Sequence, residues 1–106
     1  MRELQRIVTE AADRLSLHAS APTMLLDLQA RLGGLAAEIL HATENGRRPY
    51  RPTPGWEPAL GELAFALLNL ADQTGVDLDR AVRVAVDGFY RSGLPQQPTE
   101  AGWPFG

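Results

Sequence analysis

The chain has 106 residues, a formal net charge of −3 at neutral pH and no cysteine. This composition excludes disulfides and thiolate-bound metals and argues against a general nucleic-acid partner. All ten basic residues are arginine, which excludes a lysine nucleophile and a Walker-type phosphate lysine. The longest apolar run is too short to span a membrane, and the recurring charges of MRELQRIVTE do not resemble a secretion signal. We therefore expect a cytoplasmic protein that binds neither membranes nor nucleic acid.

Two helices are expected in the first half of the chain. Apolar residues at helical spacing predict a helix over 2–17, followed by a break at 18–21. Ser20 or Ala21 precedes Pro22, which suits the first turn of a second helix that ends near 41–44, before Asn45-Gly46. The apolar residues of this second helix alternate in steps of three and four, which predicts a seam for another helix: Leu25, Leu28, Leu32, Leu35 and Ile39.

Two more helices are expected after a loop over 42–58 that is rich in glycine, proline and polar residues. Pro58 opens the third, which ends at Gly75, and Asp77 caps the fourth, which ends at Gly93. Both carry apolar faces that we expect to point inward: Leu60, Leu63, Ala64, Leu67, Leu68 and Ala71, then Leu78, Ala81, Val82, Ala85, Val86 and Phe89. No strand signal is present. The prediction is an all-α four-helix domain over 1–93 and a flexible tail over 94–106, in which Trp103 and Phe105 have no assigned role.

Three stretches together resemble the MazG-like all-α nucleoside triphosphate pyrophosphohydrolases. The most specific is GWEPALGELAFALLNLADQTGVDLDRAV over 55–82, similar to the family's tryptophan, its helix E-L-G-D-V-L-F-x-L-L-x-L-A and the G-[VI]-D-L that follows. LLDLQARLGGLAAEILHAT over 25–43 is similar to L-L-x-L-V-E-E-V-G-E-L-A-x-E-I-L-x-A-T, and GRRPYRPT continues the match. The resemblance covers roughly residues 3–92 and implies a four-helix MazG-like bundle.

The resemblance also implies a magnesium site that this chain has mostly lost. The family holds Mg²⁺ with an E-E-x-x-E motif and an E-x-x-D motif on neighbouring helices, and hydrolyses nucleoside triphosphates to the monophosphate and pyrophosphate. The corresponding residues here are Ala30, Arg31 and Gly34, then Ala59 and Glu62. Because one carboxylate remains of five, and one position has become arginine, the leading hypothesis is an inactive relative with a binding or structural role and no cofactor.

The competing hypothesis is a Mg²⁺-dependent nucleoside triphosphate pyrophosphohydrolase with a depleted site. Glu38 lies one turn beyond Gly34, so Glu38 and Glu62, with Asp72 nearby, form a reduced metal site in this interpretation. The alternative interpretation of the same residues is that Glu38 is solvated and Glu62 pairs with Arg31.

Two further features have a structural and a functional interpretation. Small residues at Ala30, Gly33, Gly34 and Ala37 favour close helix approach over a ligand cavity, although each glycine costs about 1 kcal/mol inside a helix. Arginines in the long loop and at the end of the last helix are candidates for binding a phosphate or nucleotide, or are simply solvated: Arg47, Arg48, Arg51 and Arg91.

The small core favours self-association. Four short helices in about ninety residues bury a modest apolar area, so we expect a homodimer or homotetramer. The resemblance implies assembly through helices.

Overall fold

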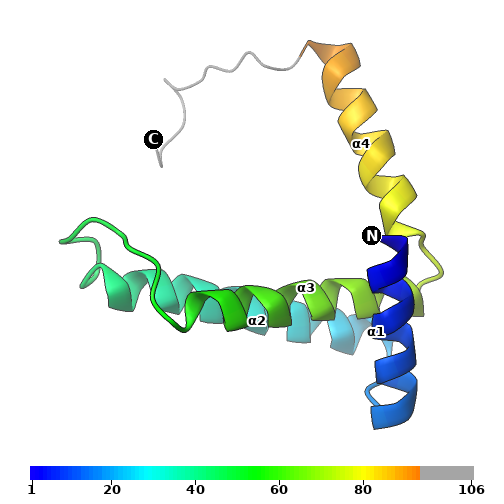
Figure 1. The fold of residues 1–106 in the computed structure, drawn as a ribbon, viewed down its shortest axis with the longest axis horizontal. Helices are drawn as coiled ribbons and strands as arrows, with labels where there is room; N and C mark the ends of the chain where they lie inside the picture. The colour runs from blue at the N-terminus through cyan, green and yellow to red at the C-terminus, as the bar shows by residue number, and fades with distance from the viewer. Residues whose placement is uncertain (94–106) are drawn as a thin grey trace.

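The computed structural model describes residues 1–93, and this part of the chain is all-helical, as predicted (Figure 1). It contains α1 (Arg2–Leu15), α2 (Ala21–Ala42), α3 (Trp56–Gln73) and α4 (Leu78–Ser92). The segment over 94–106, with Trp103 and Phe105, lies outside the described residues. Within 1–93, no helix combines the length and apolarity needed to cross a membrane.

The helix ends follow the capping signals of the sequence. The Ser20 side chain accepts a hydrogen bond from the backbone N–H of Thr23 at 3.4 Å, and that of Asp77 accepts from Arg80 N–H at 3.2 Å. Gly93 caps α4 with a φ of +65°, a left-handed conformation that glycine adopts without steric cost. Helix α3 begins at Trp56, two residues before the predicted Pro58, because Gly55 serves as its N-cap.

Helices α2 and α3 form an antiparallel hairpin, closed at its far end by the loop over 43–55 (Figure 1). Helix α1 crosses the C-terminal end of α3, and α4 leads away from the hairpin as a separate arm (Figure 1). Gln5 joins α1 to the start of α4: its Nε2 donates to the Val76 carbonyl at 2.7 Å, and its Oε1 accepts from Leu78 N–H at 3.0 Å. Within one chain the four helices therefore form an open L rather than a closed bundle.

The buried core is small and lies where α1, α2 and α3 meet. Its apolar members are Val8, Ala12, Met24, Leu35, Ala66, Leu68 and Ala71. Thr43 and Asn69 are the buried polar residues among those described. Asn69 Nδ2 donates to the Leu17 carbonyl at 3.2 Å, which holds the α1–α2 connection against α3.

Several residues predicted to face inward are exposed in the structure. In α2, Met24 and Leu35 are buried and Leu28 is half-buried, whereas Leu25, Leu32 and Ile39 of the predicted seam are exposed. Leu60 and Leu67 of α3 are open as well, and α4 has no buried residue. The predicted apolar faces exist, but the α2–α3 contact covers only part of the faces of these two helices and leaves that of α4 exposed.

Candidate functional site

Arg31 occupies the centre of the face on which the family resemblance predicts a metal. Its Nη1 donates to Glu62 Oε1 of α3 at 2.9 Å, and its Nε donates to Asp27 Oδ2, one turn earlier on α2, at 2.9 Å. The hydrogen bond to Asp27, followed by the charges of Asp27 and Glu62, raises the pKa of Arg31. The guanidinium therefore stays charged and bridges two carboxylates from neighbouring helices. The expected pairing of Arg31 with Glu62 is present.

The other positions of the lost motif supply no metal ligand. Ala30 and Gly34 are exposed and Ala59 is half-buried. A Cβ added at Gly33 or Gly34 would meet no atom within 4 Å, so no other helix of the same chain approaches these glycines closely. They lie in open space on α2.

Glu38 has a role that neither interpretation of the sequence anticipated. Its Oε1 accepts a hydrogen bond from Thr53 Oγ1 at 2.7 Å, and its carboxylate lies so close to Gly55 that a Cβ there would be 2.9 Å from Oε2. Nearby, Tyr50 packs edge-on against Trp56, with ring centroids 5.6 Å apart. Burial, with the Glu38 charge, raises the pKa of Tyr50. Glu38 is half-buried and anchors the 43–55 loop to α2.

These residues do not fit a magnesium ion. Glu38 and Glu62 are engaged with different partners, Thr53 and Arg31, and the positive charge of Arg31 lies beside Glu62. Among residues 1–93, no group of three or more histidine, aspartate or glutamate side chains is arranged to hold a metal. The reduced Glu38–Glu62 site is therefore not assembled in the structure.

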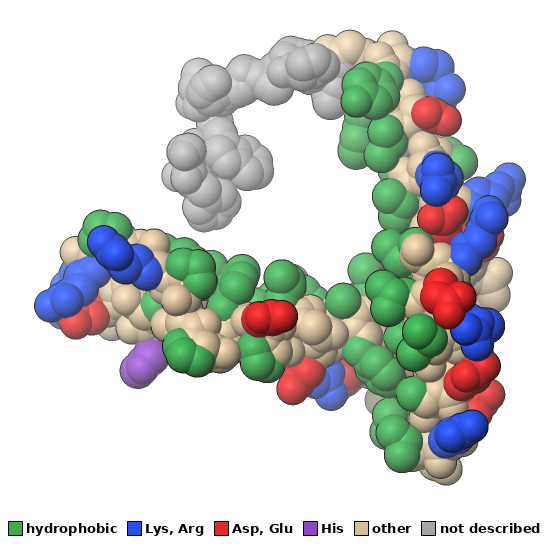
Figure 2. All heavy atoms as spheres, viewed as in Figure 1, with side chains coloured by type: hydrophobic (Ala, Val, Ile, Leu, Met, Phe, Trp, Pro, Cys, Tyr) green, Lys and Arg blue, Asp and Glu red, His purple; other side chains and the backbone are tan. Residues whose placement is uncertain are grey.

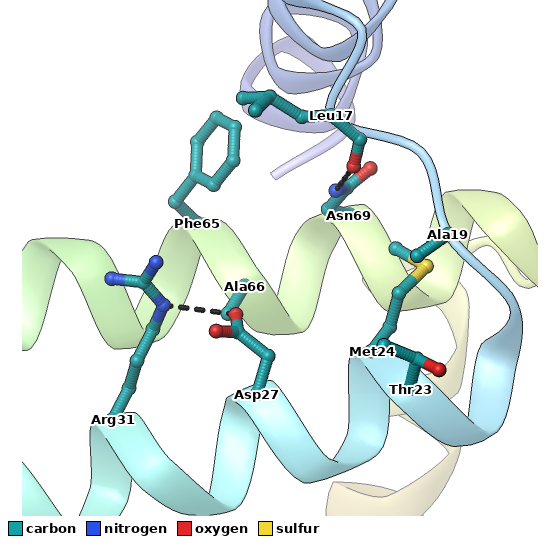
Figure 3. A pocket seen from close by; sticks show the side chains of 9 residues that line it. All are labelled: Leu17, Ala19, Thr23, Met24, Asp27, Arg31, Phe65, Ala66 and Asn69. Carbon is teal, nitrogen blue, oxygen red and sulfur yellow. Dashed lines mark hydrogen bonds and ion pairs between the residues drawn. The ribbon is translucent and has the colours of Figure 1, made fainter.

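A cavity of about 290 Å³ opens beside Arg31, between the hairpin and the α1–α2 connection (Figure 3). Phe65 and Met24 contribute apolar walls, whereas Asp27 and Arg31 lie at one side, joined by their hydrogen bond (Figure 3). Asn69 also lines this cavity, and its buried Oδ1 has no hydrogen-bond partner. Asp27 and Asn69 were not predicted as site residues. For Asp27, the available signal in the sequence was its position four residues before Arg31, a spacing that allows an ion pair on a helix. For Asn69, it was a single amide side chain within the apolar stretch LLNLA.

The candidate phosphate-binding arginines do not form one cluster. Arg48 pairs with Glu44 at 3.3 Å and lines a shallow hollow of about 400 Å³ with Arg51. Arg91 lies in the last turn of α4, on the arm that leads away from the hairpin. The loop arginines thus remain candidates for binding an anion at the surface. Arg91 lies on a different part of the molecule and does not belong to this group.

Comparisons of the chain with protein-family models, with curated proteins and with solved structures found no match.

Proposed function

We propose that this protein is a MazG-like relative that has exchanged its metal site for an ion-pair bridge and acts as a binding or structural protein. The observation that carries the proposal is the Arg31 guanidinium, 2.9 Å from carboxylate oxygens of both Asp27 and Glu62. The order of the helices and the residues quoted over 25–43 and 55–82 support the family assignment. We further propose that copies of the chain assemble through their helices into a homodimer or homotetramer.

The bridge disfavours a divalent cation for an electrostatic reason. Two unit charges about 4 Å apart interact by about 4 kcal/mol at an effective dielectric constant of 20, and Mg²⁺ carries two charges. A cation beside Glu62 would meet repulsion from Arg31 and compete with it for the same oxygens. Arg31 is also already paired, so a phosphate or nucleotide has no unpaired arginine there and is expected at Arg47 and Arg51 instead.

The experiment measures metal binding and turnover in parallel. Millimolar Mg²⁺ or Mn²⁺ is expected to leave the melting temperature of the natural chain unchanged, whereas a ligand at 100 times its Kd would add about 2.7 kcal/mol. No pyrophosphate release is expected from a panel of nucleoside and deoxynucleoside triphosphates. Pyrophosphate release that Glu62→Ala abolishes would overturn the proposal and establish a Mg²⁺-dependent pyrophosphohydrolase.

A restored variant tests the residue correspondence. Glutamate at Ala30, Arg31, Gly34 and Ala59, with Glu62→Asp, should create Mg²⁺-dependent thermal stabilisation. A control with glutamate at Leu26, Gly33, Ala37 and Arg80 carries the same change in net charge on other exposed positions, and should gain none. Equal stabilisation of the two variants would contradict the correspondence, because it would reflect screening of added charge.

A further inference from the structure

Helix α4 is strongly amphipathic, yet its apolar side touches almost nothing. Val82, Val86 and Phe89 are exposed, and Phe89 leaves 60% of its surface accessible. At 100° per residue they form one stripe. Arg80, Arg83, Asp87 and Arg91 lie away from it, whereas Asp79 lies one turn before Val82 at its N-terminal end and pairs with Arg2 and Arg83. Figure 2 shows hydrophobic side chains on the side of this arm that faces into the angle of the L, with charged ones on its outer side. A helix of about 15 residues is marginal in water without a packing partner.

The α2–α3 hairpin carries a second unpartnered apolar surface. Leu25, Leu32 and Ile39 recur every seven residues along α2 and are exposed, although they adjoin the buried Leu28–Leu35 contact. Leu60 and Leu67 are exposed with the same spacing on α3. Each stripe is rotated from the α2–α3 contact in the same sense along its own helix, and in an antiparallel pair such stripes lie on one face of the hairpin. We call these five residues the leucine face.

The two surfaces match in length and chemistry but do not meet within one chain. Helix α4, at 1.5 Å per residue, is about 22 Å long, and Leu25 to Ile39 spans about 21 Å. The leucine face has no charged residue in its stripes. Asp79, at the N-terminal end of the α4 stripe, is already paired with Arg2 and Arg83. The described chain directs α4 away from the hairpin, and its packing neighbour is α1 (Figure 1). Each chain therefore offers one apolar helix stripe and one apolar hairpin face of similar length.

We propose that α4 of a second copy packs over the leucine face, and that its own leucine face receives α4 in return. One twofold axis closes both contacts, so neither the leucine face nor the α4 stripe is left to recruit a third chain. Seven-residue spacing of leucine is typical of helix–helix packing, which favours a helix over a flat partner. An interface of standard size buries about 800 Å² per partner, and each copy would contribute both an α4 stripe and a leucine face to this one. This inference rests on the proposed assembly of copies and is independent of the metal site.

Cysteine cross-linking tests the pairing directly, because the natural chain contains no cysteine. One preparation carries Leu32→Cys and another Val86→Cys, and mild oxidation follows mixing. We expect a disulfide-linked dimer in the mixture at a yield several-fold above that of Leu32→Cys alone. Strong self-linking of Leu32→Cys would show hairpin packing on hairpin, which overturns this pairing but not the assembly. A monomer by light scattering at micromolar concentration would overturn both.

Paired charge substitutions provide the matched control. Phe89→Asp in the stripe of α4 should convert the dimer to monomer, whereas Val84→Asp, at a residue 57% exposed on another side of α4, should leave it dimeric. On α2, Leu32→Asp should dissociate the dimer, and Leu26→Asp, outside the leucine face and 65% exposed, should not. Dissociation by the controls to the same degree would contradict the assignment of these faces. Circular dichroism of each variant separates lost assembly from lost folding.

Discussion

The hairpin and α4 contain similar proportions of apolar residues but are stabilised in different ways. Helices α2 and α3 bury Leu35, Ala66 and Leu68 against each other and against α1, and Arg31 bridges them with an ion pair. Helix α4 buries nothing and is tied to α1 through Gln5 and the Arg2–Asp77 contact. An apolar stripe thus makes a helix stable only where another element covers it.

The largest contrast is expected in amide hydrogen exchange. In the monomeric Leu32→Asp variant, amides over 82–92 should exchange near their intrinsic rates, because opening α4 exposes no buried side chain. Amides near Leu68 should exchange at least about a thousandfold more slowly, since they open with the hairpin. Mass spectrometry of peptides from the two regions measures the ratio. Equal protection would show that α4 packs within its own chain.

Leu35→Ala should weaken the hairpin strongly, whereas truncation of a nearby exposed leucine should not. Removing the buried Leu35 side chain is expected to cost about 2–5 kcal/mol of unfolding free energy. Leu26→Ala, at an exposed position of the same helix, should change it by less than about 0.5 kcal/mol. Urea denaturation followed by circular dichroism gives both values. Similar losses would mean that the two leucines are covered to the same extent.

Alanine at Gly33 or Gly34 should stabilise the hairpin. Each glycine lies in the interior of α2 with open space where a Cβ would stand, so each substitution should add about 0.5–1 kcal/mol. Gly46→Ala is the control, because the φ of +90° there disfavours a side chain and stability should fall. Thermal denaturation measures the three variants. A loss of stability for Gly34→Ala would indicate that another molecule packs on this face.

The smallest effect concerns acid at the junction of α1 and α4. The hydrogen bond from Arg83 at 2.9 Å, with the charges of Arg83 and Arg2, lowers the pKa of Asp79 below its usual 3.8. A lowered pKa stabilises the folded state above the unfolded pKa, and this contribution disappears as the pH falls through the folded value. The protection factors of amides at the start of α4, which compare the measured exchange rates with the intrinsic rates at the same pH, should therefore fall below about pH 4. Asp79→Asn should flatten this dependence, and an unchanged profile would contradict it.

Much of the local structure followed from the sequence. Ser20, Asp77 and Gly93 marked helix ends that the structure confirms, because capping depends on neighbouring backbone groups. The partnership of Arg31 and Glu62 was also anticipated from the charge at one motif position. Glu38 was misjudged, since its partner Thr53 comes from a loop whose path no periodicity describes.

The sequence by itself determined the helices, their caps and the presence of apolar stripes, because all three depend on residues a few positions apart. Tertiary structure decided which stripes are covered. The apolar seam from Leu25 to Ile39 is continuous in sequence. In the structure, Leu35 is buried and Leu28 half-buried, whereas Leu25, Leu32 and Ile39 are exposed. Periodicity specifies that a face is apolar, whereas the direction in which the chain leaves α3 determines that α4 does not cover that face within its own chain.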